Sequence, residues 1–167
     1  TVSGGLQFSD ITVGRLTNQH TCGRLSSTGL IHCWGGNSSG QFGNNTLVPS
    51  LTPVVGGGGV AHTSLSLGDR FTCGIRAGNV AFCWGNNFLG QLGDSTSGNN
   101  RTNPVAVKGG QNFTAISSGV VHTCGLTAGG LVYCWGDNSA GGLGQDPTLV
   151  TGTTGPILVP GVNSVTQ

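Results

Sequence analysis

The sequence predicts an all-β chain built from three similar sheets, each of about four short antiparallel strands. Three observations support this prediction. The stretch HTCGLTAGGLVYCWGDN, at residues 122–138, has two closely similar counterparts upstream. Segments rich in β-branched and aromatic residues alternate with Gly, Asn and Ser, as in short strands joined by tight turns. No sustained run of residues has helical spacing.

The recurring stretch marks a unit of about 51 residues that occurs three times, which is the most specific signal in the chain. The leading cysteines, Cys22, Cys73 and Cys124, lie 51 residues apart. Each unit continues with a similar run after its tryptophan, and a proline follows at Pro53, Pro104 and Pro156. We divide the chain at these prolines into residues 1–53, 54–104 and 105–156, with residues 157–167 as the start of a further unit.

The strands of one unit follow each other in a fixed order, which the third unit shows best. FTAIS (113–117) comes first, followed by HTCGLT (122–127) and LVYCWG (131–136). A last strand lies at the proline, as in PVAV (104–107) of the second unit. Four short strands in about 50 residues, repeated, are typical of β-propeller blades. A solenoid with short rungs is the second interpretation, but it would need a period of roughly 20–30 residues.

Each unit has one cysteine in its second strand and one in its third, so the repeat predicts that the two cysteines of a unit pair with each other. In an antiparallel hairpin, the residue numbers of any two facing residues add up to the same value. If the two cysteines of a unit face each other, the turns of the second and third units are centred on Gly78 and Gly129, where we expect positive φ. The first unit has one extra residue, so its turn at Ser27-Thr28-Gly29 should differ or carry a bulge. The expected disulfides are Cys22–Cys33, Cys73–Cys83 and Cys124–Cys134, each stabilising the fold by about 2–3 kcal/mol.

Zinc coordination and buried reduced thiols are the alternatives for these cysteines. In the first unit two histidines accompany the cysteines, but Phe71 replaces the first histidine in the second unit. No unit has the tight C-x₂-C spacing that is typical of zinc modules. Disulfides indicate an oxidising compartment, so we expect an extracellular or cell-surface protein.

Composition excludes several classes of partner. Charged residues make up 7% of the chain, the net charge is +1, and there is no Glu and a single Lys, Lys108. Such a chain has no electrostatic basis for binding nucleic acid or a charged membrane surface. No apolar run approaches the roughly 20 residues of a membrane span, so we expect no membrane insertion.

The run F-T-A-I-S-S-G, then H-T-C-G-L, then Y-C-W-G-D-N-x-x-G-G-L-G and a proline, resembles the regulator of chromosome condensation repeat. The resemblance covers nearly the whole chain, with small departures at Phe71 and at Gly142, which replaces Gln41 and Gln91. It implies a propeller of about seven blades, so three units would be part of a larger ring, or several chains would complete a ring or filament. The paired cysteines resemble the secreted members of the family. No partner-binding residue is carried over, because those residues lie in loops that the repeat motif does not define.

We expect no catalytic site, no cofactor and no metal. His20 and His122 share one position of the repeat, which indicates a structural role, and the counterparts of Asp137 are Gly36 and Asn86. The chain has no nucleophile elbow, phosphate-binding loop or calcium loop. The recurring residues Trp34, Trp84, Trp135, Asn37, Asn87 and Asn138 are expected to be structural, through blade packing and turns. Stacking of the tryptophans on sugars is the alternative.

The connectors between the last motif glycine and the proline vary, whereas the rest of the unit does not. They read NNTLVPSLT (44–52), DSTSGNNRTN (94–103) and QDPTLVTGTT (145–154). Such loops usually carry partner recognition. We therefore predict a non-enzymatic extracellular scaffold that binds a protein or glycan partner. A structural subunit of a self-assembling, glycosylated fibre or coat is the first alternative, and a lectin-like sugar binder is the second.

Four sequons are candidate glycosylation sites. Asn44 and Asn100 lie in connectors and are the better candidates, whereas Asn37 and Asn112 lie in motif segments where packing is expected to restrict access.

Overall fold

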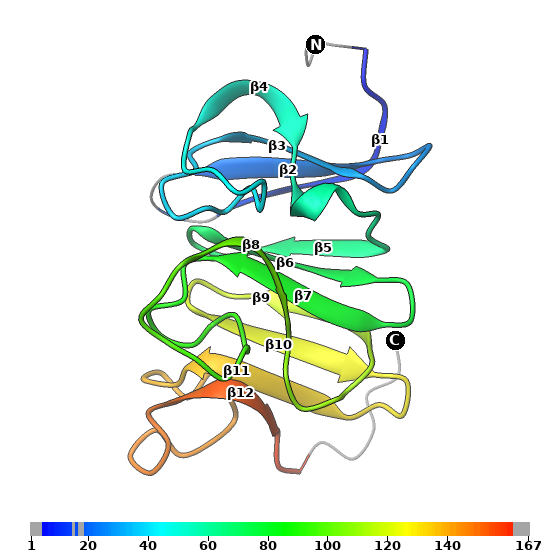
Figure 1. Cartoon of the computed structure of the whole chain (residues 1–167). Helices are drawn as coiled ribbons and strands as arrows, with labels where there is room; N and C mark the ends of the chain where they lie inside the picture. The colour runs from blue at the N-terminus through cyan, green and yellow to red at the C-terminus, as the bar shows by residue number, and fades with distance from the viewer. Residues whose placement is uncertain (1–4, 15, 17–18, 162–167) are drawn as a thin grey trace.

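Three four-stranded antiparallel sheets form the chain (Figure 1). The structure is a computed structural model that describes residues 5–14, 16 and 19–161. The first blade contains β1 (Phe8–Val13), β2 (His20–Leu25), β3 (Ile31–Gly35) and β4 (Ser50–Val55). The second contains β5 (Ser64–Leu67), β6 (Phe71–Arg76), β7 (Val80–Gly85) and β8 (Arg101–Ala106). The third contains β9 (Phe113–Ser118), β10 (His122–Thr127), β11 (Val132–Asp137) and β12 (Gly152–Leu158).

The predicted all-β blade architecture is therefore confirmed. Among the described residues the one helical segment is η1 (Gly57–Gly59), a single 3₁₀ turn between the first and second blades. Each sheet has its strands in chain order, because short turns join neighbouring antiparallel strands. Three blades of this kind fit within a larger propeller ring.

The central hairpin of each blade has the register that the cysteines predict. Cys22 faces Cys33, and the other two pairs face each other in the same way. All three pairs form disulfides in the structure, with Cα atoms 4.1 Å apart. The turn geometry differs from the prediction in one place, because the positive φ of the third hairpin falls on Gly130 (79°) and not on Gly129. Gly78 has the expected positive φ of 83°.

The prolines that divide the predicted units lie inside strands of the structure. Pro53, Pro104 and Pro156 lie within β4, β8 and β12, so the sheets end two residues beyond the expected limits. Residues 157 and 158 accordingly belong to the third blade, and the expected further unit lies largely outside the described residues. Proline is tolerated there because each of these strands is the outer edge of its sheet, where an N–H is not needed for pairing.

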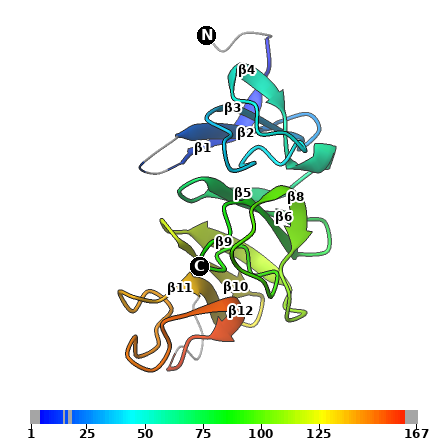
Figure 2. The ribbon, with the colours of Figure 1, turned by 60° about the vertical axis from the view of Figure 1, so that its left-hand side comes forward.

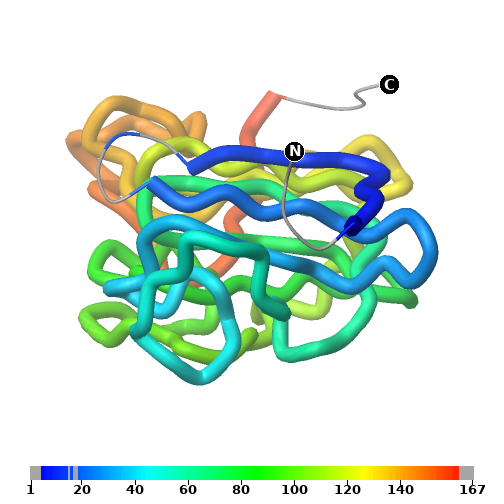
Figure 3. Tube along the Cα trace, turned by 90° about the horizontal axis from the view of Figure 1, so that it is seen from above, coloured from blue at the N-terminus to red at the C-terminus, as the bar shows by residue number. Residues whose placement is uncertain are grey.

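The blades are stacked face to face (Figure 1), and Figure 3 views the stack from above. The core lies between the blades. One buried cluster joins Ile31 and Phe42 of the first blade to Leu67 and Trp84 of the second. An equivalent cluster joins the second blade to the third. Its members are Phe71, Cys73, Ile75, Ala81, Cys83, Leu92, Phe113 and Trp135. The first and second disulfides face the following blade, and Trp84 and Trp135 face the preceding one, so both interfaces combine a disulfide with a tryptophan.

Candidate interaction surface

The variable connectors emerge on one side of the stack. In Figure 1 they form the loops on the left, while the turns of the central hairpins point to the right, and Figure 2 brings the connector side forward. The irregular parts of the connectors are residues 44–49, 94–100 and 145–151, and we call these three segments the connector loops. Three chemically different loops are thus presented side by side by a nearly constant frame.

The buried tryptophans fix the base of the connectors. Trp84 Nε1 donates a hydrogen bond to the carbonyl oxygen of Gln41 over 2.9 Å, and Trp135 Nε1 donates to that of Gln91 over 3.0 Å. Each indole lies directly over a glycine, Gly43 or Gly93, where an added Cβ would come within 2.7 Å of the ring. Positive φ at these glycines and the indole above them exclude other residues at this point. The turns before the first and second connector loops are therefore held by the next blade.

A recurring asparagine then holds each connector loop from inside. Asn37 receives a hydrogen bond at Oδ1 from the Phe42 amide and donates through Nδ2 to the carbonyls of Thr46 and Val48. Asn87 and Asn138 make the corresponding contacts in their blades. All three asparagines are at most 1% exposed. These contacts satisfy both ends of each amide, which gives the loops defined conformations despite their different sequences.

The second connector loop is polar and carries an ion pair. Asp94 and Arg101 approach to 2.8 Å, and Thr96 donates to the same carboxylate through its amide and its hydroxyl. Burial alone would raise the pKa of Asp94, but the hydrogen bonds from Thr96 and Arg101 outweigh it and leave the pKa below its ordinary value. The loop is thus held by a charged centre.

The other two connector loops present apolar side chains instead. Leu47 and Val48 are 53% and 69% exposed, and Leu149 is 82% exposed. Exposed leucines grouped on loops are typical of surfaces that other molecules cover. The connector side therefore offers a polar segment between two apolar ones.

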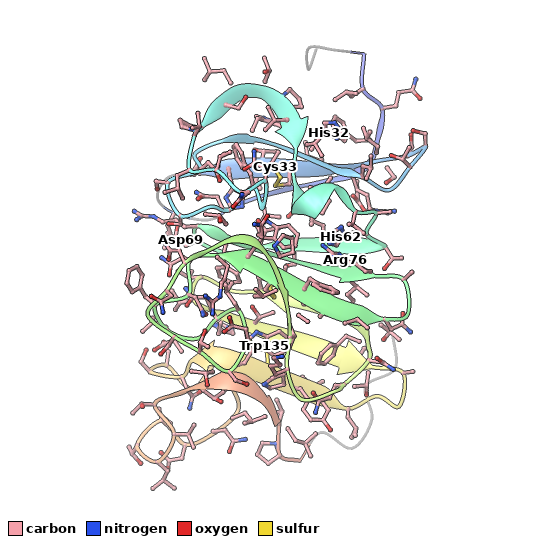
Figure 4. All side chains as sticks on the ribbon, in the orientation of Figure 1. His32, Cys33, His62, Asp69, Arg76 and Trp135 are labelled. Carbon is pink, nitrogen blue, oxygen red and sulfur yellow. A yellow bond between two sulfur atoms is a disulfide. The ribbon has the colours of Figure 1, made fainter. Side chains whose placement is uncertain are left out.

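Two of the four histidines, His20 and His62, occupy the interface between the first and second blades. His20 is buried, and its Nε2 lies 2.8 Å from Thr72 Oγ1 of the second blade. His62 is also buried, with Nδ1 2.8 Å from the Val60 carbonyl and Nε2 accepting from Arg76 Nε over 3.2 Å. Figure 4 shows His62 and Arg76 side by side near η1. Burial lowers the pKa of each imidazole to about 4, with Arg76 adding to the effect at His62 and the Val60 bond opposing it.

His122 differs from its counterpart His20, because it is only half-buried and lies on the face of the third blade that points away from the second. Sequence reasoning missed His62 and Arg76. Alignment of the units would have placed His62 at the position of Phe8 and Phe113 in the other two units. A buried imidazole at an otherwise aromatic position needs a hydrogen-bond partner, which Arg76 provides.

The four sequons differ in accessibility. Asn100 and Asn112 are exposed, and Asn44 is half-buried. Asn37 is 1% exposed, and its amide nitrogen is occupied by the hydrogen bonds described above. A glycan on Asn37 would have to displace these hydrogen bonds, in keeping with the expectation that packing restricts access to this residue.

The described residues contain no cluster of three or more His, Cys, Asp or Glu side chains that could hold a metal ion. Within the same ranges, no helix is long and apolar enough to cross a membrane.

Two family models described as the regulator of chromosome condensation (RCC1) repeat match the chain, one at residues 63–91 and 113–141 and the other at residues 79–126. The fold is similar to that of human WBSCR16, with a TM-score of 0.80 and 21% identity over 95% of this chain and 39% of that one. It is also similar to yeast RCC1 (Prp20) in its complex with Kap60, with a TM-score of 0.79 and 17% identity over 97% and 39% of the two chains.

The ectodomain of the Physcomitrella patens receptor kinase CR4 is similar at 27% identity, with a TM-score of 0.51 over 81% of this chain and 29% of that one. The chain spans less than two fifths of the length of each of these three structures.

Proposed function

Because the chain is a member of the family of regulator of chromosome condensation repeats, we propose that it is a segment of an extracellular β-propeller that binds protein partners through its connector loops. The observation that carries the proposal is that the blades are nearly constant whereas the connector loops differ. The tryptophan and asparagine contacts recur from blade to blade, whereas the three loops that they hold differ in charge and apolarity. A frame that fixes unlike loops side by side is suited to recognising one extended surface.

A binding role is supported by the fold. Yeast RCC1 (Prp20) has been crystallised bound to a protein, Kap60, and the present blades share its architecture. The two buried histidines are engaged with Thr72 and with Val60 and Arg76, and Asp94 is engaged with Arg101 and Thr96. These groups stabilise the blades and loops, and we propose that the chain is not an enzyme.

The extracellular location is supported by the three disulfides, which persist in oxidising compartments. A likeness to the ectodomain of a receptor kinase is consistent with it. The low charge of the chain also favours a partner recognised by shape and polarity over one that carries a high charge.

Exchange of the connector loops tests the binding proposal. The full-length natural protein would be screened against a panel of purified ectodomains, together with three variants in which residues 44–49, 94–100 or 145–151 become Gly-Ser linkers of equal length. We expect at least one interaction that one or more of these variants lose while their unfolding temperature stays within a few degrees of wild type. An interaction that survives all three exchanges, or the absence of any interaction, would contradict the proposal.

A further inference from the structure

An open cleft of about 490 Å³ lies between the second and third blades on the connector side. Phe88, Leu89 and Ser97 of the second blade form one wall, and Asp137, Thr151 and Thr153 of the third blade contribute to the other. The turn that carries Phe88 packs closely on the start of β12, since a Cβ on Gly90 would come within 2.9 Å of the Thr153 carbonyl. The two walls are therefore held in a fixed relation.

The apolar wall is specific to this blade. Phe88 and Leu89 are 61% and 47% exposed. The residues at the same positions are Ser38 and Ser39 in the first blade and Ser139 and Ala140 in the third. Blade packing therefore does not require a phenylalanine here, and its exposed ring adds apolar surface to the cleft that neither other blade has.

The opposite wall provides one negative charge. Asp137 Oδ2 accepts hydrogen bonds from the Ser139 amide and hydroxyl over 3.2 and 2.6 Å. Its other oxygen, Oδ1, has no hydrogen bond within the described part of the chain. None of the residues that line the cleft is basic, so this carboxylate is not neutralised within it.

The corresponding position between the first and second blades has no unpaired carboxylate among the residues described, because Arg101 there forms an ion pair with Asp94. By strand register, Arg101 pairs with Gly85 as Thr153 pairs with Gly136, and Asn86 replaces Asp137. An arginine whose charge is balanced by Asp94, and a neutral asparagine, offer no carboxylate to a cationic group there. The carboxylate of Asp137, unpaired within the described ranges, thus distinguishes this cleft from the corresponding position between the first two blades.

We propose that this cleft binds an arginine side chain of a protein partner, with its guanidinium on Asp137 and its planar face on the ring of Phe88. Leu89 would contact an apolar residue next to that arginine. The inference rests on the proposed function, because it names the chemistry of one partner side chain.

The two proposed contacts of the guanidinium, one with an aromatic ring and one with a carboxylate, both already occur within the chain. The Arg76 guanidinium carbon lies 3.9 Å from the centre of the Phe82 ring, and Arg101 Nη2 lies 2.8 Å from an Asp94 carboxylate oxygen. Arginine is favoured over lysine because its planar group can stack on an aromatic face and bond a carboxylate at the same time.

Titration of the 167-residue chain with a short peptide tests this assignment. The probe is acetyl-Leu-Arg-Leu-amide, and acetyl-Leu-citrulline-Leu-amide is its uncharged match. In ¹⁵N-resolved NMR spectra we expect the arginine peptide to shift the amides of residues 88–89, 137 and 151–154. The citrulline peptide is expected to bind about tenfold more weakly, as follows from loss of a charge-assisted hydrogen bond.

Two variants use residues that the other blades already accept. Asp137→Asn copies Asn86, whose Oδ1 accepts from the Phe88 amide in the same kind of turn, and Phe88→Ser copies Ser38. Each is expected to weaken the arginine peptide about tenfold or more. The matched controls are Asp146→Asn, whose carboxylate holds Thr148 as Asp137 holds Ser139, and Leu149→Ser, which removes another exposed apolar side chain. Both controls should bind as wild type does.

Equal binding of the two peptides, shifts elsewhere than at the cleft, no binding, or an equal loss in the control variants would overturn the assignment. So would shifts at the cleft with a panel of neutral monosaccharides but not with the arginine peptide, which would indicate a sugar site instead. Failure of this inference can be told apart from failure of the proposed function. If a protein partner is lost on connector exchange but still binds the Asp137→Asn variant, the proposed function holds and the arginine site is wrong.

Discussion

Trp84 of the second blade donates a hydrogen bond to the carbonyl oxygen of Gln41 in the first, with Nε1 and O 2.9 Å apart. Thr72 Oγ1 donates to the same oxygen, also over 2.9 Å. Trp135 and Thr123 repeat the arrangement on Gln91. The carbonyl at the base of each of these two connectors is therefore saturated by the following blade, which couples blade packing to loop position.

Replacement of Trp84 by phenylalanine tests this coupling. The variant keeps an aromatic ring but loses the donor and part of the buried surface, so we expect the free energy of unfolding to fall by about 2–3 kcal/mol. Urea denaturation followed by circular dichroism measures it. Trp34→Phe is the control, because Trp34 is only half-buried, and its cost should be clearly smaller. Equal losses in the two variants would show that the hydrogen bond across the interface is unimportant.

The second disulfide is expected to contribute to stability in two ways. Cys73 and Cys83 close a loop of sequence separation 10 and are both fully buried against the third blade. Replacing both with alanine should cost about 3–4 kcal/mol, of which about 2–3 kcal/mol is the lost cross-link and the rest the lost packing. Thermal unfolding compared with wild type measures this. A variant as stable as wild type would show that the disulfide is dispensable.

The frame could be predicted from the sequence because it is repeated. Alignment of the three units showed which positions are constant. Pairing the cysteines within each unit then predicted the hairpin register, in which Cys124 faces Cys134 as in the structure. Pro53, at which we divided the first unit from the second, lies within the edge strand β4, so the repeat and the sheet end at different residues. The cleft could not be predicted, since it brings Phe88 and Asp137 together from two blades, and that contact depends on how the sheets pack.

Acid is expected to weaken the interface between the first and second blades selectively. His20 and His62 are buried there with pKa values of about 4, whereas histidine in an unfolded chain titrates near 6.5. Between these values the unfolded chain binds more protons, so stability is complete above about pH 6.5 and falls as the pH is lowered toward 4. The loss should be on the order of 2–3 kcal/mol per histidine. Urea denaturation at several pH values measures it.

The second interface provides the control for this pH dependence. Phe71 and Phe113 occupy the two histidine positions there. His20→Phe should reduce the loss of stability between pH 6.5 and 4 by about half, and Phe71→His should increase it. If neither substitution changes the dependence of the free energy of unfolding on pH, the groups responsible for the acid sensitivity are not the histidines of this interface.

The buried asparagines should control the order of the connector loops. Asn138 donates to the carbonyls of Gln145 and Val150 and accepts from the Leu143 amide. Asn138→Ala leaves these buried groups without partners, so we expect a loss of about 2–3 kcal/mol and faster amide exchange across residues 145–151. Hydrogen–deuterium exchange with mass spectrometry measures the second effect, with residues 94–100 as the internal control. Equal acceleration in both connector loops would indicate global destabilisation instead.

Glycosylation should follow exposure and not the presence of a sequon alone. Asn100 is exposed in a connector loop, whereas Asn37 is buried with its amide nitrogen bonded to Thr46 and Val48. On secretion from a eukaryotic host we expect a glycan on Asn100 and none on Asn37, because a glycan attached before folding would prevent the first blade from closing around that side chain. Glycopeptide mass spectrometry decides between the sites, and Asn100→Gln is the control that should remove the signal. A secreted, protease-resistant chain with a glycan on Asn37 would contradict the loop-holding role of this residue, since the same nitrogen cannot bear a sugar and make those hydrogen bonds.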